Sequence, residues 1–341
     1  MQFRGQGKPA VGVIFDAAIG QRIGDILAMA VLYGLDGKNE CRVVSVSTSK
    51  SHLKSAALAE VIGRFYAGAV SGAFGAVGRT LPVGLSTDGN LSAETPMMKA
   101  VLERTSPDGK PAYNHGIQHL NDTAEVPALI RNAFTSQFDQ NAVVVLAGPA
   151  TNLAAVLAVK GARDWIAQKV RQLVWVATEE TVREDLPAAR RVAAEWPGDV
   201  VIVPPAVGDA VLFPAASIEK DFAWSKDHPI ADAYRAFRPM PYDAPMHAAA
   251  AVLYAVRPAQ PFFTASDPGA LEIAGNGAIQ FRAAPAGKHR ILRLNPDKNN
   301  DLLATYIELA SAKPVPRVSR FRPPVAETKK ADPTKPAEKK P

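Results

Sequence analysis

The 341-residue sequence predicts an α/β protein with an open, mostly parallel β-sheet, helices on both faces and a small C-terminal β hairpin. Three observations predict this class. Short β-branched runs alternate with longer segments of helical period, which is typical of strands joined by crossover helices. Some strand candidates, such as residues 142–147, are apolar throughout, as expected when helices cover both faces of a sheet. A hydrophobic content of 47% is enough to form one sizeable core.

The first strand and helix lie within residues 11–32. The run VGVIF before Asp16 predicts a buried strand, and two glycines then mark a turn before an apolar helix that begins near Asp25. Asp16 is therefore expected at the carboxyl end of a strand, where open α/β sheets place their sites. Asp25 is expected at a helix start, where negative charge is favourable.

The remaining elements follow in alternation. Further strands are predicted at residues 41–49, 81–85, 142–147, 173–177 and 200–203. Helices are predicted at residues 52–66, 94–104, 122–138, 185–195, 228–237 and 246–256, with one more that is capped by Thr151 or Asn152. A hairpin over residues 271–281 turns at Asn276-Gly277, and residues 289–294 form another small strand. The glycine-rich residues 68–78 lack a phosphate-loop ending and are predicted to be a flexible connection.

Charge divides the chain into two parts. The net charge is +6, but residues 313–341 hold nine Lys and Arg against three acids, so the rest of the chain is balanced. We expect one domain over residues 1–312 and a disordered basic tail, rich in Pro and Lys, over residues 313–341. A neutral body gives no reason to expect specific nucleic-acid binding.

Composition also bears on compartment and metals. The single cysteine, Cys41, excludes an internal disulfide and fits a reducing compartment. The longest uncharged stretches are short for a bilayer span and no secretory pattern is present, so we expect a soluble, cytoplasmic protein without a membrane span. His115 and His119 have a metal-like spacing, but their turn-rich surroundings predict a loop.

The loop from Asp16 to Asp25 resembles the amino-terminal aspartate loop of the inosine/uridine-preferring nucleoside hydrolases. That family has Asp-x-Asp-x-Gly, a short spacer, then Asp-Asp and an apolar helix. Asp16, Gly20 and Asp25 match the pattern, whereas Ala18 and Gly24 replace two of its aspartates.

Two further segments carry the resemblance. LAGPATNLA, residues 146–154, is similar to the family's Gly-Pro-x-Thr-Asn turn, in which the threonine carbonyl binds calcium, and Thr151 holds that place. Residues 245–258 resemble a helix in which a leaving-group histidine precedes a calcium-binding aspartate. His247 holds the histidine position, and Ala248 replaces the aspartate. Residues 178–184, TEETVRE, lack the family's Gly-Gly turn and the Glu-x-Asn segment that grips ribose.

The resemblance implies a site at the carboxyl edge of the sheet. It predicts a ligand pocket containing Asp16, Arg22, Asp25 and Asn152, a vestigial metal site of Asp16, Asp25 and Thr151, and His247 as the catalytic residue. Calcium takes about six to eight oxygen ligands, and the matched segments no longer supply them, so no cofactor is expected. Arg22 lies between the two aspartates and is predicted to balance their charge in place of the metal, the alternative being a solvent-facing side chain.

The functional prediction is a nucleoside hydrolase-like pseudoenzyme with degraded calcium and ribose sites. It would lack calcium-dependent ribohydrolase activity and bind a nucleoside or ribosyl small molecule, a partner, or a second copy in a homo-oligomer. The alternative is an active hydrolase of N-glycosidic bonds with a rebuilt site. A third reading is protein binding through the basic tail.

Overall fold

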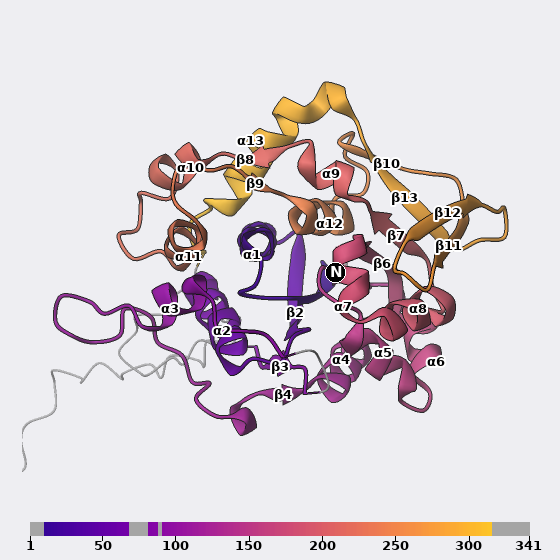
Figure 1. The fold of residues 1–341 in the computed structure, drawn as a ribbon, viewed down its shortest axis with the longest axis horizontal. Coiled ribbons are helices and arrows are strands. Elements are labelled where there is room, and N and C mark those ends of the chain that lie inside the picture. The colour runs from indigo at the N-terminus through magenta and orange to yellow at the C-terminus, as the bar shows by residue number, and fades with distance from the viewer. Residues whose placement is uncertain (1–9, 68–80, 88–90, 316–341) are drawn as a thin grey trace, which may run out of the picture.

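The computed structural model describes residues 10–67, 81–87 and 91–315. These residues form an eleven-stranded sheet in the order β12-β11-β13-β7-β6-β5-β1-β2-β3-β4, with β10 paired to β13 (Figure 1). The strands are β1 (Val11–Ala17), β2 (Cys41–Thr48), β3 (Val83–Leu85), β4 (Ala124–Glu125), β5 (Ala142–Leu146), β6 (Val170–Val176), β7 (Val200–Val203), β10 (Phe263–Ala265), β11 (Gly269–Ile273), β12 (Ile279–Ala283) and β13 (His289–Leu294). A separate pair joins β8 (Leu212–Phe213) and β9 (Ala244–Pro245).

Strand β1 lies at the centre and pairs in parallel with both β2 and β5. From β1 the chain adds β2 and β3 on one side, whereas β6 and β7 continue beyond β5 on the other. The strand order therefore reverses between β1 and β5, which is the topological switch point where α/β sheets open a crevice at their carboxyl ends. Asp16 pairs with Ser47 on β2 and with Leu146 on β5, which places it at this point.

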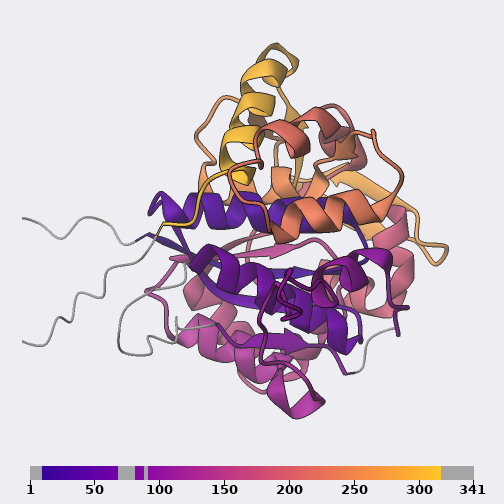
Figure 2. The same cartoon turned by 90° about the vertical axis from the view of Figure 1, so that its left-hand side faces the viewer.

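Helices cover both faces of the sheet (Figure 2). Val13 and Phe15 of β1 share one core with the first group of helices, whereas Ile14 faces the second, as the period of two in a strand requires. The first group is α1 (Ile23–Gly37), α2 (Leu53–Ala67), α3 (Pro96–Leu102), α10 (Ala215–Lys220), α11 (Pro229–Phe237), α12 (His247–Val256) and α13 (Asn299–Ala310). The second group is α4 (Val126–Thr135), α5 (Thr151–Ala158), α6 (Ala162–Lys169) and α8 (Leu186–Glu195). Two short helices, α7 (Glu179–Glu184) and α9 (Pro205–Asp209), follow β6 and β7.

The predicted fold class is confirmed, including the C-terminal hairpin, which β11 and β12 form. Strand β13 also pairs in parallel with β7, so the hairpin extends the main sheet. The helices α6, α7, α9, α10 and α13 were not predicted. The predicted connection at residues 68–78 and the predicted tail beyond residue 315 lie outside the described residues. Within the described ranges, no helix is both long and apolar enough to span a bilayer.

Candidate functional site at the carboxyl edge of the sheet

Asp16 is fully buried at the end of β1. Its Oδ2 accepts hydrogen bonds from Ser47 Oγ and from Asn152 Nδ2, the latter at 2.6 Å. The same Asn152 nitrogen donates to the Thr48 carbonyl at 3.0 Å. Asp16 Oδ1 is also buried and has no hydrogen-bond partner among the described residues. Two segments beside β1, β2 and the start of α5, thus hold one carboxyl oxygen of Asp16, and the other oxygen stays without a partner among the described residues.

Asp25 lies in the first turn of α1 and is 3% exposed. The Ala18 backbone N–H donates a hydrogen bond to its carboxyl group, while its Oδ2 has no partner within the described chain. The turn between the two aspartates depends on Gly20, whose φ is +83° and whose missing Cβ would lie 2.7 Å from Met98 Cε. Only glycine fits this position without strain.

Burial changes the acidity of both aspartates. Desolvation raises the pKa of Asp16 to about 7, although the hydrogen bonds from Ser47 and Asn152 act in the opposite direction. Desolvation likewise raises the pKa of Asp25 to about 7, against the lowering effect of the Arg22 guanidinium. Both carboxyl groups therefore exchange protons near neutral pH, in the range useful for acid–base chemistry and for donating to a ligand.

Gly148 brings the end of β5 against the aspartate loop. A Cβ at Gly148 would lie 2.8 Å from the Ala18 backbone nitrogen and would also overlap Ser49 Oγ. The Gly-Pro turn recognised in the sequence is therefore needed for close approach of two backbones.

Arg22 makes different contacts from those predicted. Its Nη2 pairs with Glu184 and, at 3.3 Å, with Glu180, both from α7. No ion pair within 4.0 Å joins Arg22 to Asp16 or Asp25, so the predicted bidentate contact is absent, and the guanidinium acts on Asp25 only through space. Arg22 is also not solvent-facing, because its side chain is 25% exposed.

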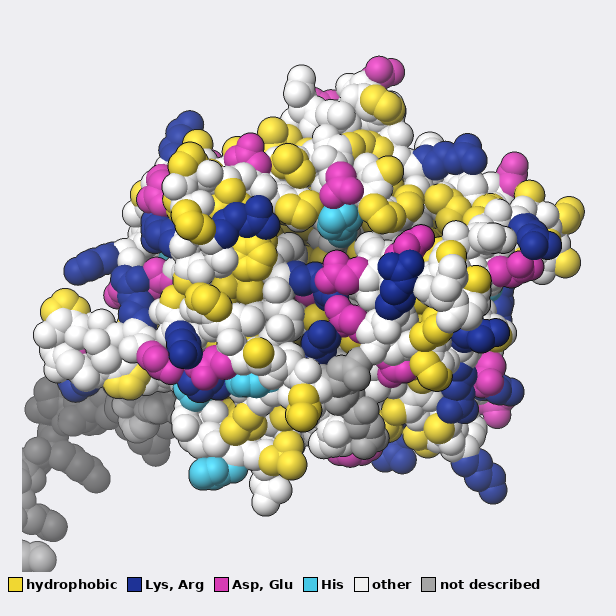
Figure 3. Space-filling view, viewed as in Figure 1, with side chains coloured by type: hydrophobic (Ala, Val, Ile, Leu, Met, Phe, Trp, Pro, Cys, Tyr) yellow, Lys and Arg dark blue, Asp and Glu magenta, His cyan; other side chains and the backbone are white. Residues whose placement is uncertain are grey.

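The sequence reasoning missed the acidic partners of this arginine. Residues 178–184, where the family's ribose-gripping segment is predicted to be missing, comprise α7 and its N-cap, Thr178. The helix places Glu180 and Glu184 four residues apart on one face. Lys50, in the loop after β2, pairs with Glu184 at 3.2 Å. Acidic and basic side chains gather at the centre of this face of the molecule, over α7 (Figure 3).

Thr151 and Asn152 do not cap α5, which is a correction to the prediction. The N-cap is Ala150 and has no side-chain bond, since Thr151 and Asn152 are already the first two helical residues. Their side chains instead form hydrogen bonds to residues outside α5. Thr151 Oγ1 donates to Asp185 at 2.6 Å, and Asn152 reaches Asp16.

His247 starts α12, and its Nε2 lies 3.0 Å from Asp209 Oδ1 of α9. No hydrogen bond or ion pair of the described residues joins His247 to Asp16, Asp25 or Arg22. The structure therefore pairs the predicted catalytic histidine with Asp209.

The metal site that the resemblance implies was tested against the donors present. Among the described residues, no group of three or more His, Cys, Asp or Glu side chains is arranged to hold a metal ion. At two positions where the resemblance implies aspartate ligands, Ala18 and Ala248 offer no side-chain oxygen, and one carboxyl oxygen of Asp16 already accepts two hydrogen bonds. These residues do not fit the coordination that calcium prefers. His115 and His119 lie in a loop, as predicted.

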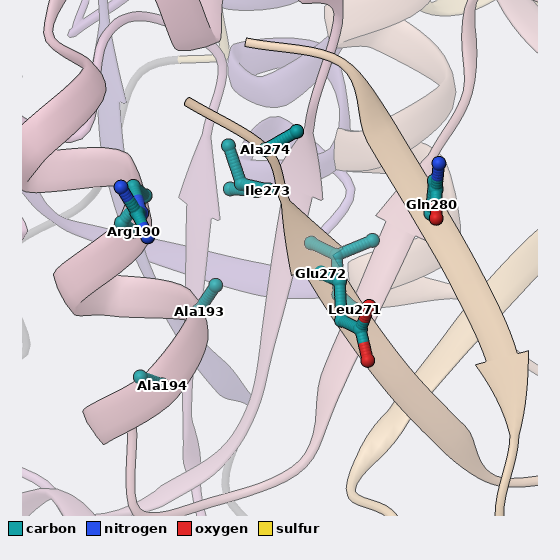
Figure 4. A pocket seen from close by; sticks show the side chains of 8 residues that line it. All are labelled: Arg190, Ala193, Ala194, Leu271, Glu272, Ile273, Ala274 and Gln280. Atoms are coloured by element: carbon teal, nitrogen blue, oxygen red, sulfur yellow. The ribbon is translucent and has the colours of Figure 1, made fainter. Parts of the chain in front are cut away.

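A groove of about 350 Å³ lies elsewhere, between α8 and the β11–β12 hairpin (Figure 4). It is lined by Arg190, Ala193, Ala194, Leu271, Glu272, Ile273, Ala274 and Gln280. None of the predicted site residues lines this groove. The aspartate site is closed to solvent in this structure, since Asp16 and Asp25 are both buried.

Comparisons with known proteins concern the fold. No family model matches the sequence, and no curated protein matches it either. Solved structures do match. A plant nucleoside hydrolase superposes with a TM-score of 0.63 at 18% identity, covering 89% of this chain and 100% of that chain. The chain has the nucleoside hydrolase fold.

Two more structures with this fold agree. A purine-preferring ribonucleoside hydrolase from Gardnerella vaginalis matches with a TM-score of 0.60 at 17% identity, covering 88% of this chain and 99% of that one. The type III effector protein XopQ, complexed with adenosine diphosphate ribose, matches with a TM-score of 0.58 at 12% identity over 90% and 94%. The nucleoside hydrolase fold is thus found in a hydrolase and in an effector protein.

Proposed function

We propose that this chain binds a ribosyl-containing small molecule at the Asp16 site and does not catalyse calcium-dependent ribohydrolysis. The observation that carries the proposal is the arrangement of Asp16 at the switch point. Ser47 and Asn152 fix one carboxyl oxygen, and the other is buried without a partner. Asp25 supplies a second such oxygen from the same loop.

Unpaired buried acceptors favour a ligand that brings hydroxyl groups. Leaving such a group unsatisfied costs about 1–3 kcal/mol, so a ligand that donates to it gains affinity. A ribose carries adjacent hydroxyl groups that can donate to Asp16 and Asp25. The adenosine diphosphate ribose complex of XopQ supports a ribosyl ligand on this fold.

The same residues are the reason to propose a site without calcium. The Arg22 guanidinium already acts on Asp25, and Ala18 and Ala248 supply no side-chain oxygen ligands. A dication would compete with these side chains for space and charge. We therefore propose no metal cofactor for the bound state.

Calorimetric titration with ribose, adenosine and adenosine diphosphate ribose tests the proposal. The wild type is expected to bind at least one of them, and Asp16→Asn is expected to weaken binding up to about tenfold, the value of one lost hydrogen bond. Asp139→Asn is the matched control, because Asp139 is exposed and pairs with Lys169 away from the site. Binding of none of the three, or equal affinity in Asp16→Asn, would overturn the proposal.

One observation favours a second function, hydrolysis of an N-glycosidic bond. Asp16 and Asp25 both have a pKa of about 7, and a pair of carboxyl groups that titrate near neutral pH suits general acid–base catalysis. Ribose release from a nucleoside panel separates the two functions. Suppose that the wild type releases ribose, that Asp16→Asn abolishes this turnover, and that a calcium chelator leaves it unchanged. That result would establish the hydrolase function and exclude a function in binding alone.

A further inference from the structure

Glu184 bridges two cations that come from different loops. Arg22 Nη2 pairs with its Oε1, and Lys50 Nζ lies 3.2 Å from its Oε2. Arg22 lies between β1 and α1, and Lys50 follows β2, so both cations come from the loops at the carboxyl ends of neighbouring strands. Their side chains are 25% and 18% exposed. A carboxylate held between an arginine and a lysine occupies the position that an oxyanion of a ligand would take.

Arg22 has donor capacity that the glutamates do not use. Its Nη1 is buried and has no partner in the described part of the chain. Guanidinium carries five N–H donors in a planar fork that matches phosphate as well as carboxylate. A phosphate group offers three oxygens where Glu184 offers two, so it can satisfy Nη1, Nη2 and Lys50 together.

Charge balance allows the exchange. Glu180 and Glu184 together bring two negative charges to the cations, and a phosphate monoester carries about −1.5 to −2 at pH 7. Glu180 is already 75% exposed and loses little on returning to water. Replacement of the glutamates by one phosphate group therefore preserves the local charge.

We propose that Arg22 and Lys50 form an anion subsite in which the phosphate group of the ligand displaces the α7 glutamates. The ligand class is then a phosphorylated pentose, with its hydroxyl groups at Asp16 and Asp25 and its phosphate on the two cations. This inference rests on the proposed ribosyl binding. In the absence of an anion, Glu184 fills the subsite through its ion pairs with Arg22 and Lys50.

The test compares ribose with ribose 5-phosphate by calorimetry. The wild type is expected to prefer the phosphorylated sugar about tenfold, the value of the added charge-assisted hydrogen bonds. Glu184→Gln is expected to raise the affinity for ribose 5-phosphate several-fold and to leave that for ribose unchanged, because the competing carboxylate charge is gone. Glu179→Gln is the matched control, since Glu179 lies on the same helix and pairs with the exposed Arg183 instead.

Two further variants test the cations. Lys50→Met and the charge-conserving Arg22→Lys are each expected to reduce the preference for the phosphorylated sugar. Circular dichroism of both variants is the check that they fold. Equal affinity for the two sugars in the wild type, or equal effects of Glu184→Gln and Glu179→Gln, would overturn the anion subsite while leaving ribosyl binding intact.

Inorganic phosphate separates the two proposals completely. If phosphate stabilises the wild type against heat and Lys50→Met removes that effect while neither sugar binds, the two cations bind phosphate, but ribosyl binding and the phosphorylated-pentose ligand class are both rejected. If neither sugar nor phosphate binds, both proposals are rejected.

Discussion

Replacement of Asp16 by asparagine should change how the stability of the protein depends on pH. Burial raises the pKa of Asp16 from 3.8 to about 7, so the folded state holds a proton that the unfolded state has released between these values. The stabilisation from this proton is fully present below pH 3.8 and is lost as the pH rises through 7. Asp16→Asn has no proton to lose and should not show this loss.

The expected size follows from linkage. One group that is protonated in the folded state and ionised in the unfolded state changes the free energy of unfolding by about 1.4 kcal/mol per pH unit. Between pH 4.5 and 6.5 the wild type should therefore lose about 3 kcal/mol more than Asp16→Asn. Asp25 contributes a similar loss in both proteins, so the variant keeps part of the slope.

Denaturant unfolding of both proteins at half-unit pH intervals measures this difference. The quantity compared is the slope of unfolding free energy against pH. A pH-independent loss of stability from the altered hydrogen bonds to Ser47 and Asn152 does not change this slope. Groups that both proteins share, such as His228, cancel. Parallel curves for the wild type and Asp16→Asn would refute the reasoning, because they would mean that Asp16 is ionised when folded.

Two other predictions concern the support of the site and the core. Gly148→Ala should lower the free energy of unfolding by about 1–3 kcal/mol, because the new methyl group would overlap the Ala18 backbone. Denaturant unfolding measures this loss, and an unchanged unfolding midpoint would contradict the close approach of the two backbones. His228 is buried among Phe65, Phe222 and Trp224, and desolvation lowers its pKa to about 3. It therefore stays neutral when folded, and its contribution to stability is lost as the pH falls from about 6.5 towards 3. His228→Phe should remove this acid-induced loss in unfolding curves between pH 4 and 7, whereas a constant offset from the wild type would speak against it.

The sequence was sufficient to predict the fold and the location of the two aspartates. Strand β1 is apolar up to Asp16, and turn glycines follow, so local pattern alone places the carboxyl group at the sheet edge. The same holds for Asp25, whose position in the first helical turn follows from the apolar period of α1. Both positions follow from the pattern of residues that are neighbours in the sequence.

Contacts over long sequence separations could not be predicted. Arg22 pairs with acids 158 and 162 residues away, both on the six-residue helix that Thr178 caps. Asn152 was predicted as a possible cap, yet it bonds to Asp16 across 136 residues. The partner of such a polar side chain depends on how β1, β5 and α7 pack together in the folded protein. Local sequence propensity carries no information on that packing.

Calcium binding is the most direct test of the central claim, that Asp16 and Asp25 form a protonated ligand site without a metal. The protein is dialysed against millimolar calcium chloride, freed of unbound ion, and its calcium content is measured by mass spectrometry alongside Asp16→Asn. The account predicts well under one ion per chain and no difference between the two proteins. One ion per chain in the wild type, lost in Asp16→Asn, would contradict it.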